Sequence, residues 1–217
     1  VSAPPEVIVA LGGGSIIDTA KVLAAAQGDF TRVLTSLKGG SGLATGTFTP
    51  IIAIPSTAGT GSEVTSWATV WDQQGGKKYS LAHPALYPEA AIVDPTITLG
   101  VPRGLTLATG LDALSHSLES LWNVSANPVS ANFAVAAARE IMEVLPRLLD
   151  DPGNLAVRPG GALSVYYCPY GTNQHRLRVG ASSRCLRRHD EHVGARGAAH
   201  RRGLGLAQES VLRSCAR

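Results

Sequence analysis

Apolar and polar residues follow two patterns along this chain, one typical of strands joined to helices and one typical of helices alone. Short, continuous apolar runs that contain β-branched residues predict buried strands. These strands cover residues 7–11, 49–55 and 90–94. An alanine-rich stretch over 16–27 has helical periodicity and predicts a helix after the first strand. Residues 67–71 and 78–81 predict a short hairpin around Gln74-Gly75-Gly76.

From residue 98 onward the pattern is helical. Apolar residues at helical spacing predict helices over 105–122 and 130–149, and Asn127-Pro128 marks the break between them. We therefore expect a partial doubly wound nucleotide-binding α/β domain over residues 1–97, followed by the start of an α-helical domain over 98–157.

The composition indicates a globular protein. Apolar residues make up 44% and charged residues 16% of the chain, as is usual for globular domains. No apolar run reaches about 18 residues, so we expect no membrane-spanning helix. The first residues, Val1–Pro5, lack a basic region followed by an apolar core. We expect a cytoplasmic chain without a signal peptide and, because it does not begin with Met, a fragment or a processed protein.

Residues 158–217 differ sharply in composition from the rest of the chain. They carry 11 Arg, no Lys and 3 acidic residues, whereas residues 1–157 carry 8 Lys and Arg against 13 acidic residues. Out-of-frame translation of a GC-rich gene gives such a composition, so we hypothesise that a frameshift after Val157 replaced the native sequence. A nucleic-acid-binding tail is the competing hypothesis. The aromatic residues of this tail are Tyr166, Tyr167 and Tyr170. They lie apart from the arginine groups in the sequence, which argues against nucleic acid as a partner.

Four residues, Gly12-Gly13-Gly14-Ser15, join the first predicted strand to its helix; we call them the glycine loop. Glycine lets a backbone approach a ligand closely, and a helix start offers N–H groups and a favourable dipole to a phosphate. Ser15 can cap the helix or bind a phosphate oxygen. An ordinary tight turn explains these four residues equally well. For Lys21, farther along the helix, a solvated position is favoured over a place beside the phosphates.

Residues 56–63, Ser-Thr-Ala-Gly-Thr-Gly-Ser-Glu, follow the second predicted strand; we call them the threonine loop. Ligands of open α/β sheets bind beyond the carboxyl ends of the strands. The hydroxyl and backbone N–H groups of this loop suit phosphate and ribose, although a plain polar loop of turn-forming residues is the alternative.

Asp112 and His116 lie four residues apart in a predicted helix. This spacing places both side chains on one face, one turn apart, so that one metal ion can bind both. An oxygen and a nitrogen donor suit Fe(II) or Zn(II). Taken alone, such a pair is more often a solvated helix face or a satisfied core histidine.

Together, the three segments resemble the iron-containing alcohol dehydrogenase family. The family's Gly-Gly-Gly-Ser-x-x-Asp-x-Ala-Lys run is matched over residues 12–21 and its Gly-Thr-Gly-Ser-Glu run over 59–63. Its Gly-x-Asp-Ala-Leu-x-His run is matched over 110–116. The resemblance covers about residues 5–157 and implies an architecture related to that of dehydroquinate synthases, with a nucleotide-binding part before a helical metal-binding part.

By this resemblance, residues in and near the two loops would bind NAD or NADP. They are Gly13, Gly14, Ser15, Asp18, Ser56, Thr57, Thr60, Thr65 and Lys78. For Lys78, a plain surface position beside Lys77 is the alternative. Asp112 and His116 would hold the metal, with Fe(II) as the first expectation and Zn(II) as the second.

The implied reaction is hydride transfer between a nicotinamide and a small alcohol or aldehyde, by an enzyme that forms a homo-oligomer. Residues 77–89 and 118–123 are similar to members that reduce phosphonoacetaldehyde. The family adds two histidine ligands downstream, but its motif is matched by none of the histidines found there, which are His175, His189, His192 and His200. We therefore expect an impaired enzyme, with an inactive or cofactor-binding remnant as the alternative.

Overall fold

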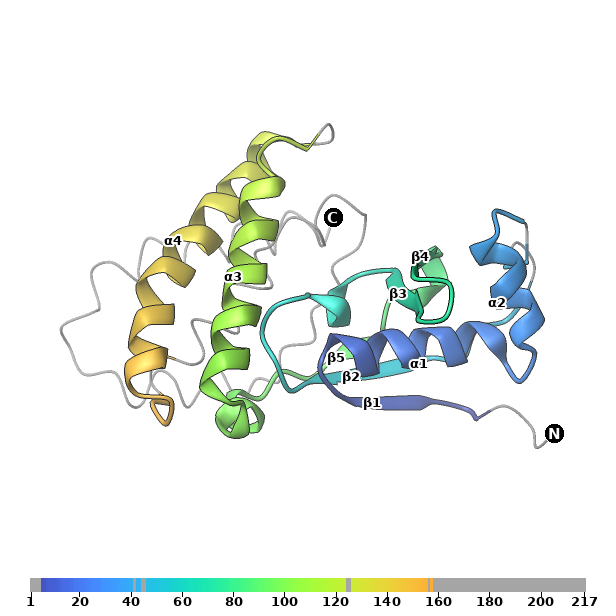
Figure 1. The fold of residues 1–217 in the computed structure, drawn as a ribbon, viewed down its shortest axis with the longest axis horizontal. Coiled ribbons are helices and arrows are strands. Elements are labelled where there is room, and N and C mark those ends of the chain that lie inside the picture. Colours follow the sequence, from blue (N-terminus) through green and yellow to red (C-terminus); the bar gives the residue numbers. More distant parts are fainter. Residues whose placement is uncertain (1–4, 41, 44–45, 124–125, 156, 158–217) are drawn as a thin grey trace, which may run out of the picture. The chain divides into compact units, whose positions relative to one another are not determined.

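The computed structural model describes residues 5–157 apart from 41, 44–45, 124–125 and 156. Within these residues, strands and helices are interspersed as far as residue 91, and a 3-10 helix and two long α-helices follow (Figure 1). The histidines and tyrosines of residues 158–217, on which part of the sequence analysis depends, lie outside the described residues.

A three-stranded parallel sheet carries the first part of the fold. Its strands are β1 (Ile8–Gly12), β2 (Ile51–Pro55) and β5 (Ala90–Ala91), in the order β1-β2-β5. The register pairs the two strand ends, Gly12 and Pro55, directly with each other. The segments that follow β1 and β2 therefore start side by side at the same edge of the sheet.

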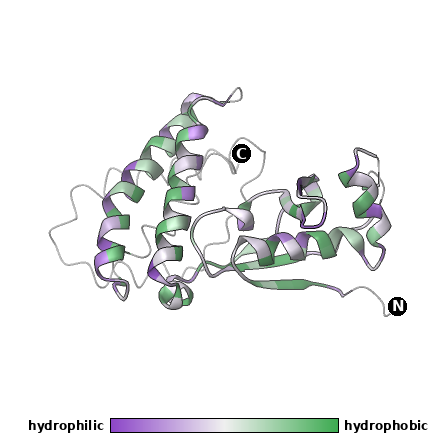
Figure 2. Cartoon of the chain, viewed as in Figure 1, coloured by the Kyte–Doolittle hydropathy of each residue, from purple (hydrophilic) through white to green (hydrophobic). Residues whose placement is uncertain are grey.

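Helix α1 (Gly14–Ala26) packs against this sheet through small side chains. Because alanine has a short side chain, the helix backbone can approach the strands closely and bury its whole inner face. The shared core consists of Ala10, Ile17, Ala20, Ala24, Ile51 and Ala53. Figure 2 shows β1 in the colour of hydrophobic residues along its length.

An antiparallel hairpin contacts the same helix. Strands β3 (Trp67–Asp72) and β4 (Lys77–Ala82) form it, and helix α2 (Phe30–Leu37) packs beside them. A second apolar core joins these elements to the end of α1. Its buried members are Ala25, Ala26, Val33, Leu43, Ala68, Leu81 and Leu86.

Three short 3-10 helices and two long α-helices complete the described residues. The short ones are η1 (Ser62–Val64), η2 (Pro84–Leu86) and η3 (Pro95–Gly100). Helices α3 (Arg103–Glu119) and α4 (Pro128–Asp150) pack against each other. None of the described helices combines the length and the apolar character that crossing a membrane requires.

The predicted fold class, a partial parallel nucleotide-binding sheet followed by helices, is confirmed for the described residues. The hairpin and all five predicted strands are present. Strand β5 is shorter than predicted, because only Ala90 and Ala91 pair with β2. The break at Asn127-Pro128 is a helix start, in which the Asn127 side chain accepts hydrogen bonds from the backbone N–H groups of Val129 and Ser130.

Helix α2 was not predicted, although its sequence carries the pattern of a helix. Its apolar residues Phe30, Val33, Leu34 and Leu37 recur at the spacing of an amphipathic helix. The segment has only eight residues, three of them β-branched, and β-branched residues have a lower helix propensity. The Asp29 side chain caps the helix by accepting from the Thr31 N–H at 2.9 Å, and Val33 anchors it in the apolar core. The predicted boundary between residues 97 and 98 falls within η3 and stays a prediction.

Candidate nucleotide and metal site

The glycine loop and the threonine loop lie against each other at the carboxyl edge of the sheet. The Ser56 N–H, the first of the threonine loop, donates to the Gly12 carbonyl oxygen at 2.9 Å. This hydrogen bond extends the pairing of β1 with β2 by one step beyond Pro55. The two segments expected to bind the nucleotide therefore begin from adjacent strands.

The absence of a side chain at Gly13 and Gly14 allows this close approach. A Cβ atom on Gly14 would lie 2.4 Å from the Thr60 Oγ1 atom, and one on Gly13 would lie 3.1 Å from the Thr57 Oγ1 atom. Two threonine hydroxyl groups thus occupy the space beside the start of α1. Alanine at position 14 would force the loops apart.

The N-terminus of α1 is open to a ligand. Gly13 is the N-cap residue; no side chain caps the helix, and its first turn carries no acidic residue. Ser15 is exposed, and its carbonyl oxygen accepts a hydrogen bond from Thr19 Oγ1 at 2.8 Å. The expectation that Ser15 could cap the helix is therefore wrong, because Gly13 holds that position. The uncapped N–H groups and the helix dipole favour an anion at this point.

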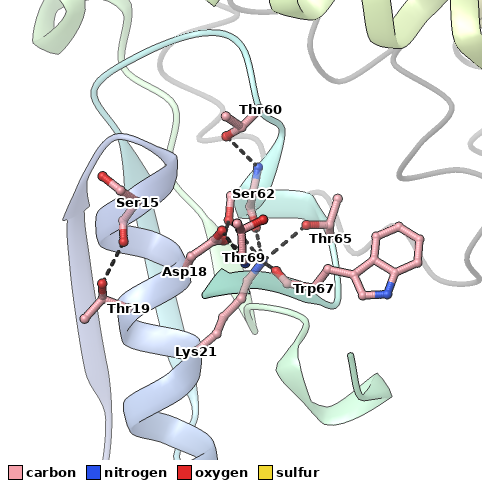
Figure 3. A network of polar contacts seen from close by, with 9 residues as sticks. All are labelled: Ser15, Asp18, Thr19, Lys21, Thr60, Ser62, Thr65, Trp67 and Thr69. Atoms are coloured by element: carbon pink, nitrogen blue, oxygen red, sulfur yellow. Dashed lines mark hydrogen bonds and ion pairs between the residues drawn. The ribbon is translucent and has the colours of Figure 1, made fainter. Parts of the chain in front are cut away.

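Lys21 is fully buried, which contradicts the favoured prediction of a solvated lysine. Its side chain is 0% exposed, and its ammonium donates to the carbonyl oxygens of Ser62 at 2.7 Å and of Trp67 at 2.6 Å (Figure 3). It also donates to Ser62 Oγ at 3.1 Å and to Thr65 Oγ1 at 3.2 Å. Buried acceptors replace the water that the ammonium loses on folding.

Asp18 binds the same segment of chain from one turn earlier in α1. Its two carboxylate oxygens accept from the Ser62 hydroxyl and from the Thr69 backbone N–H, the latter at 2.8 Å. Its carboxylate also lies 3.9 Å from the Lys21 ammonium. The polar atoms of Asp18 and Thr65, both expected near the nucleotide, thus face protein partners (Figure 3).

Burial shifts the ionisation of two residues in this network. It lowers the pKa of Lys21 to about 8, against the raising effect of the Asp18 and Glu63 carboxylates. Burial likewise raises the pKa of Glu63 to about 7, against its own backbone hydrogen bond and the Lys21 charge. Each shift disfavours the charged form, as expected for groups removed from water.

No individual role was expected for Glu63, and the prediction for Lys21 was wrong. The sequence does indicate burial of Lys21, because the buried residues Ile17 and Ala24 lie four residues before it and three residues after it on α1. For Glu63 no comparable pattern exists, since its burial depends on how η1 packs.

Lys78 lies on the exposed surface of β4. Its ammonium is 5.5 Å from the centre of the Trp71 ring on the opposite strand, a distance typical of a cation–π contact. The structure therefore places Lys78 on the hairpin surface, without a described contact to either loop.

Asp112 and His116 share one face of α3, as their spacing predicts. The His116 Nε2 atom lies 3.8 Å from the Asp112 Oδ1 atom, and their side chains are 26% and 45% exposed. We call them the metal pair. No group of three or more potential metal-binding side chains occurs among the described residues.

The donor set fits a divalent cation. With metal–ligand bonds of about 2.1 Å, a tetrahedral ion would hold two donor atoms about 3.4 Å apart. The observed 3.8 Å differs from this value by an amount that small side-chain rotations supply. Carboxylate oxygen and imidazole nitrogen are both common ligands of Fe(II) and Zn(II).

A contact between α3 and the threonine loop brings the metal pair near the nucleotide loops. A Cβ atom on Gly59 would lie 2.9 Å from the Thr109 Cβ atom and 3.0 Å from the Thr109 carbonyl oxygen. Ala58 packs against Ala113 and Ile141 of the two helices. Thr109 lies on the same face of α3 as the metal pair, three and seven residues before its two members.

Family models match both parts of the chain. A model of iron-containing alcohol dehydrogenases matches residues 1–95, and a model of the C-terminal part of Fe-containing alcohol dehydrogenases matches residues 106–176. The chain belongs to the iron-containing alcohol dehydrogenase family. The second match continues to residue 176, past the point at Val157 where the sequence resemblance was expected to end.

Individual relatives agree with this membership. The chain is 38% identical over 151 residues to the probable alcohol dehydrogenase EutG of Salmonella typhimurium, an alignment that covers 70% of this chain and 38% of EutG. It is also 38% identical over 161 residues to phosphonoacetaldehyde reductase of Streptomyces viridochromogenes, covering 70% of this chain and 40% of that protein. The chain thus spans about two fifths of the length of these relatives.

Solved structures of the family have the same fold. Sulfoacetaldehyde reductase from Bifidobacterium kashiwanohense, in complex with NAD+, superposes with a TM-score of 0.70 and 32% identity, covering 76% of this chain and 44% of that one. The NADH-dependent butanol dehydrogenase A of Thermotoga maritima gives a TM-score of 0.69 and 29% identity, covering 77% and 42%.

Proposed function

We propose that this chain carries the nucleotide loops and part of the metal site of an NAD-linked alcohol dehydrogenase or aldehyde reductase. One observation carries the proposal: the glycine loop and the threonine loop touch, and the threonine loop also touches α3 at Thr109, on the face that bears the metal pair. A nucleotide bound across the loops would therefore lie near the metal. That proximity is what hydride transfer requires.

Each part of the site has a role in this proposal. The backbone N–H groups of Gly14 and Ser15 bind the pyrophosphate at the start of α1. The hydroxyl groups of Ser56, Thr57 and Thr60 line the nucleotide groove. Asp18 and Thr65 support the loop from behind, and Lys78 approaches the nucleotide from the hairpin. NAD is the proposed nucleotide, as in the relatives named for NAD+ and NADH, with NADP as the alternative.

Asp112 and His116 hold the metal ion in this proposal, Fe(II) in the first instance and Zn(II) in the second. When bound, the metal supplies Lewis acidity toward the substrate oxygen and the nicotinamide supplies the hydride acceptor or donor. The residues of this chain orient both partners. The rigid backbone of α3 fixes the direction of the metal pair, and the threonine loop fixes the nucleotide.

The proposed substrate is a small alcohol or aldehyde. Two relatives are named for aldehydes that carry an anionic phosphonate or sulfonate group. Together with the motif similarity over residues 77–89 and 118–123, this supports phosphonoacetaldehyde as a specific candidate. The other relatives described above are named as alcohol and butanol dehydrogenases, so an unsubstituted substrate is the alternative.

We further propose that the 217-residue chain is impaired. Two side chains bind a metal more weakly than the three or four of a usual site, and the described residues offer only the metal pair. The alternative is a remnant that binds nucleotide without turnover. Turnover comparable with that of ordinary dehydrogenases, about 1 to 1000 per second, would contradict impairment and show that further ligands complete the site.

Titration of the purified chain with Co(II), a coloured substitute for Fe(II) or Zn(II), tests the metal assignment. We expect a saturable visible absorption band that Asp112→Ala and His116→Ala abolish. Glu119→Ala is the matched control, because Glu119 is an exposed acid on the same helix. Its carboxylate accepts a hydrogen bond from Ser115 Oγ at 3.0 Å. Binding that survives both metal-pair substitutions, or that Glu119→Ala removes equally, would refute the assignment.

Titration with NADH, followed by its fluorescence, tests the nucleotide assignment separately. We expect binding by the wild-type chain and weaker binding when Thr57 and Thr60 are both changed to Val, which keeps the shape and removes the hydroxyls. If the chain binds NADH but oxidises none with small aldehydes, the remnant alternative holds.

A further inference from the structure

We propose that Lys21 is a positioning residue that ties the threonine loop to helix α1 and so holds its hydroxyl groups beside the glycine loop. The inference rests on the proposed function in one respect, because it assumes that the threonine loop binds the nucleotide. It adds a role for a side chain that is fully buried.

Lys21 holds the segment from Ser62 to Trp67 at both ends. The Ser62 carbonyl oxygen, at the end of the threonine loop, accepts at 2.7 Å, and the Trp67 carbonyl oxygen, at the start of β3, accepts at 2.6 Å. The Thr65 hydroxyl between them accepts at 3.2 Å. One ammonium group, with three protons to donate, therefore fixes the two ends and the middle of this segment to one point of α1 (Figure 3).

Asp18 strengthens the same attachment. Its carboxylate accepts from the Ser62 hydroxyl and from the Thr69 N–H, and it lies 3.9 Å from the Lys21 ammonium. The positive charge of Lys21 is thus compensated inside the protein. Three residues apart on α1, the two side chains bind Ser62, the first residue of η1, and residues that follow η1.

The threonine loop depends on these polar contacts because it has few apolar side chains of its own. Its residues 56–63 are Ser, Thr, Ala, Gly, Thr, Gly, Ser and Glu. Ala58 is the member that packs against the apolar residues of α3 and α4. A polar loop gains little from the hydrophobic effect, so hydrogen bonds to α1 must define its position.

Direct contact between Lys21 and a nucleotide phosphate is inconsistent with this geometry. The side chain is 0% exposed, and four oxygen atoms lie within 3.2 Å of the ammonium. Thr60, by contrast, is exposed beside the glycine loop. An anion in the groove would meet the loop that Lys21 positions, and not Lys21 itself.

Hydrogen exchange in the absence of nucleotide tests the attachment directly. In Lys21→Met we expect amide exchange over residues 56–67 to increase by about tenfold or more, because local opening loses its restraint. Exchange over α4 should stay within about twofold of wild type. Lys77→Met is the matched control, because Lys77 is exposed on β4, and it should leave both regions unchanged.

The affinity for NADH gives a second measurement that separates positioning from direct contact. Lys21→Met should weaken binding by about tenfold or more, while the salt dependence of binding stays that of wild type. Loss of a direct ion pair with phosphate would instead reduce that salt dependence, and this result would overturn the proposal. Unchanged exchange over residues 56–67 would overturn it as well.

A less disruptive variant covers the case in which Lys21→Met fails to fold. Thr65→Val keeps the side-chain shape and removes one of the four acceptors, so exchange over 56–67 should rise several-fold with α4 unaffected. No local change in Thr65→Val would refute the attachment. Should wild type bind no NADH, the proposed function fails, whereas the exchange measurements still decide whether Lys21 holds the loop.

Discussion

The nucleotide loops and the metal pair are held in place by different physical means. The threonine loop is braced from behind by buried polar contacts from Asp18 and Lys21. Asp112 and His116 lie one turn apart on the regular helix α3, and both side chains are partly exposed. The first arrangement fixes a loop whose residues before Ser62 belong to no helix or strand, and the second uses a regular helix that packs against α4.

This difference has a consequence for stability. Buried charges restrain the loop at a cost in desolvation, so the loop region should respond strongly to pH and to changes in packing. The helical region is held mainly by apolar side chains: Ala113 and Ile141 are buried beside the site, and Val144 and Leu148 are buried farther along α4. Its response to similar changes should be smaller.

The largest expected effect is the pH dependence due to Glu63. Its pKa is about 7 in the folded chain against an ordinary value of 4.5, so between these values the folded state keeps a proton that the unfolded state has lost. Stability therefore falls as pH rises through this window. Glu63→Gln should remove the loss and gain up to about 3 kcal/mol relative to wild type between pH 4.5 and 7.5.

Denaturant unfolding at several pH values measures this effect. The series should end below pH 8, because Lys21, with a pKa of about 8, is half deprotonated at that pH. Asp72→Asn, on the exposed hairpin end, is a suitable control carboxylate. If the difference in unfolding free energy between Glu63→Gln and wild type were the same at every pH, the pKa of Glu63 would not be raised in the folded chain.

The next effect concerns the contact between the two loops. Gly14→Ala places a Cβ atom 2.4 Å from Thr60 Oγ1 and 3.1 Å from Thr60 Cβ, so the threonine loop must shift. NADH affinity should fall by about tenfold or more, equivalent to at least about 1.4 kcal/mol. Fluorescence titration provides the measurement.

A second glycine provides the control. Gly104 also lies in the first turn of a helix, and nothing lies within 4 Å of a Cβ atom built there. Gly104→Ala should therefore stabilise the chain by about 0.5 to 1 kcal/mol and leave NADH affinity unchanged. If Gly14→Ala and Gly104→Ala had the same NADH affinity, nucleotide binding would not require the close approach of the two loops.

Much of the site could be predicted because it follows from local patterns. Parallel pairing of two apolar strands places the glycine loop beside the threonine loop, and a spacing of four places Asp112 and His116 on one helix face. Each inference requires only the period of a strand or a helix. Both are properties of a short segment of sequence.

The roles of Lys21 and Ser15 could not be predicted in this way. The acceptors of Lys21 lie 41 to 46 residues away in the chain, and local sequence does not reveal that they surround it. The cap position depends on where α1 starts, two residues before the predicted start at Ile16. Contacts distant in sequence and exact helix ends are the features that pattern analysis determines least well.

A moderate effect is expected at the start of α4, in the helical region. The Asn127 side chain accepts from the N–H groups of Val129 and Ser130, each at 3.0 Å, and Ser130 Oγ accepts from the Asn127 N–H at 3.0 Å. Asn127→Ala should cost about 1 kcal/mol in unfolding free energy. Asn127→Asp, which keeps the acceptor, should cost much less. Equal losses in the two variants would show that the cap contributes nothing.

The smallest effect is expected at Glu140 on α4, and it tests the comparison between the two regions most directly. Burial, and then the charge of Glu143, raise the pKa of Glu140 to about 7, the same value as for Glu63. Glu140 is, however, partly exposed, and solvent screens its interactions. Glu140→Gln should gain less than about 1 kcal/mol relative to wild type between pH 4.5 and 7.5. In a chain that keeps Glu140, Glu143→Gln should also reduce the pH dependence of stability, because it removes the negative charge that helps to raise the pKa of Glu140. If the pH dependence of the unfolding free energy due to Glu140 were as large as that due to Glu63, buried ionisable groups would matter equally in both regions. The difference between a loop held by buried polar contacts and a partly exposed helix face would then not explain how stability is distributed in this chain.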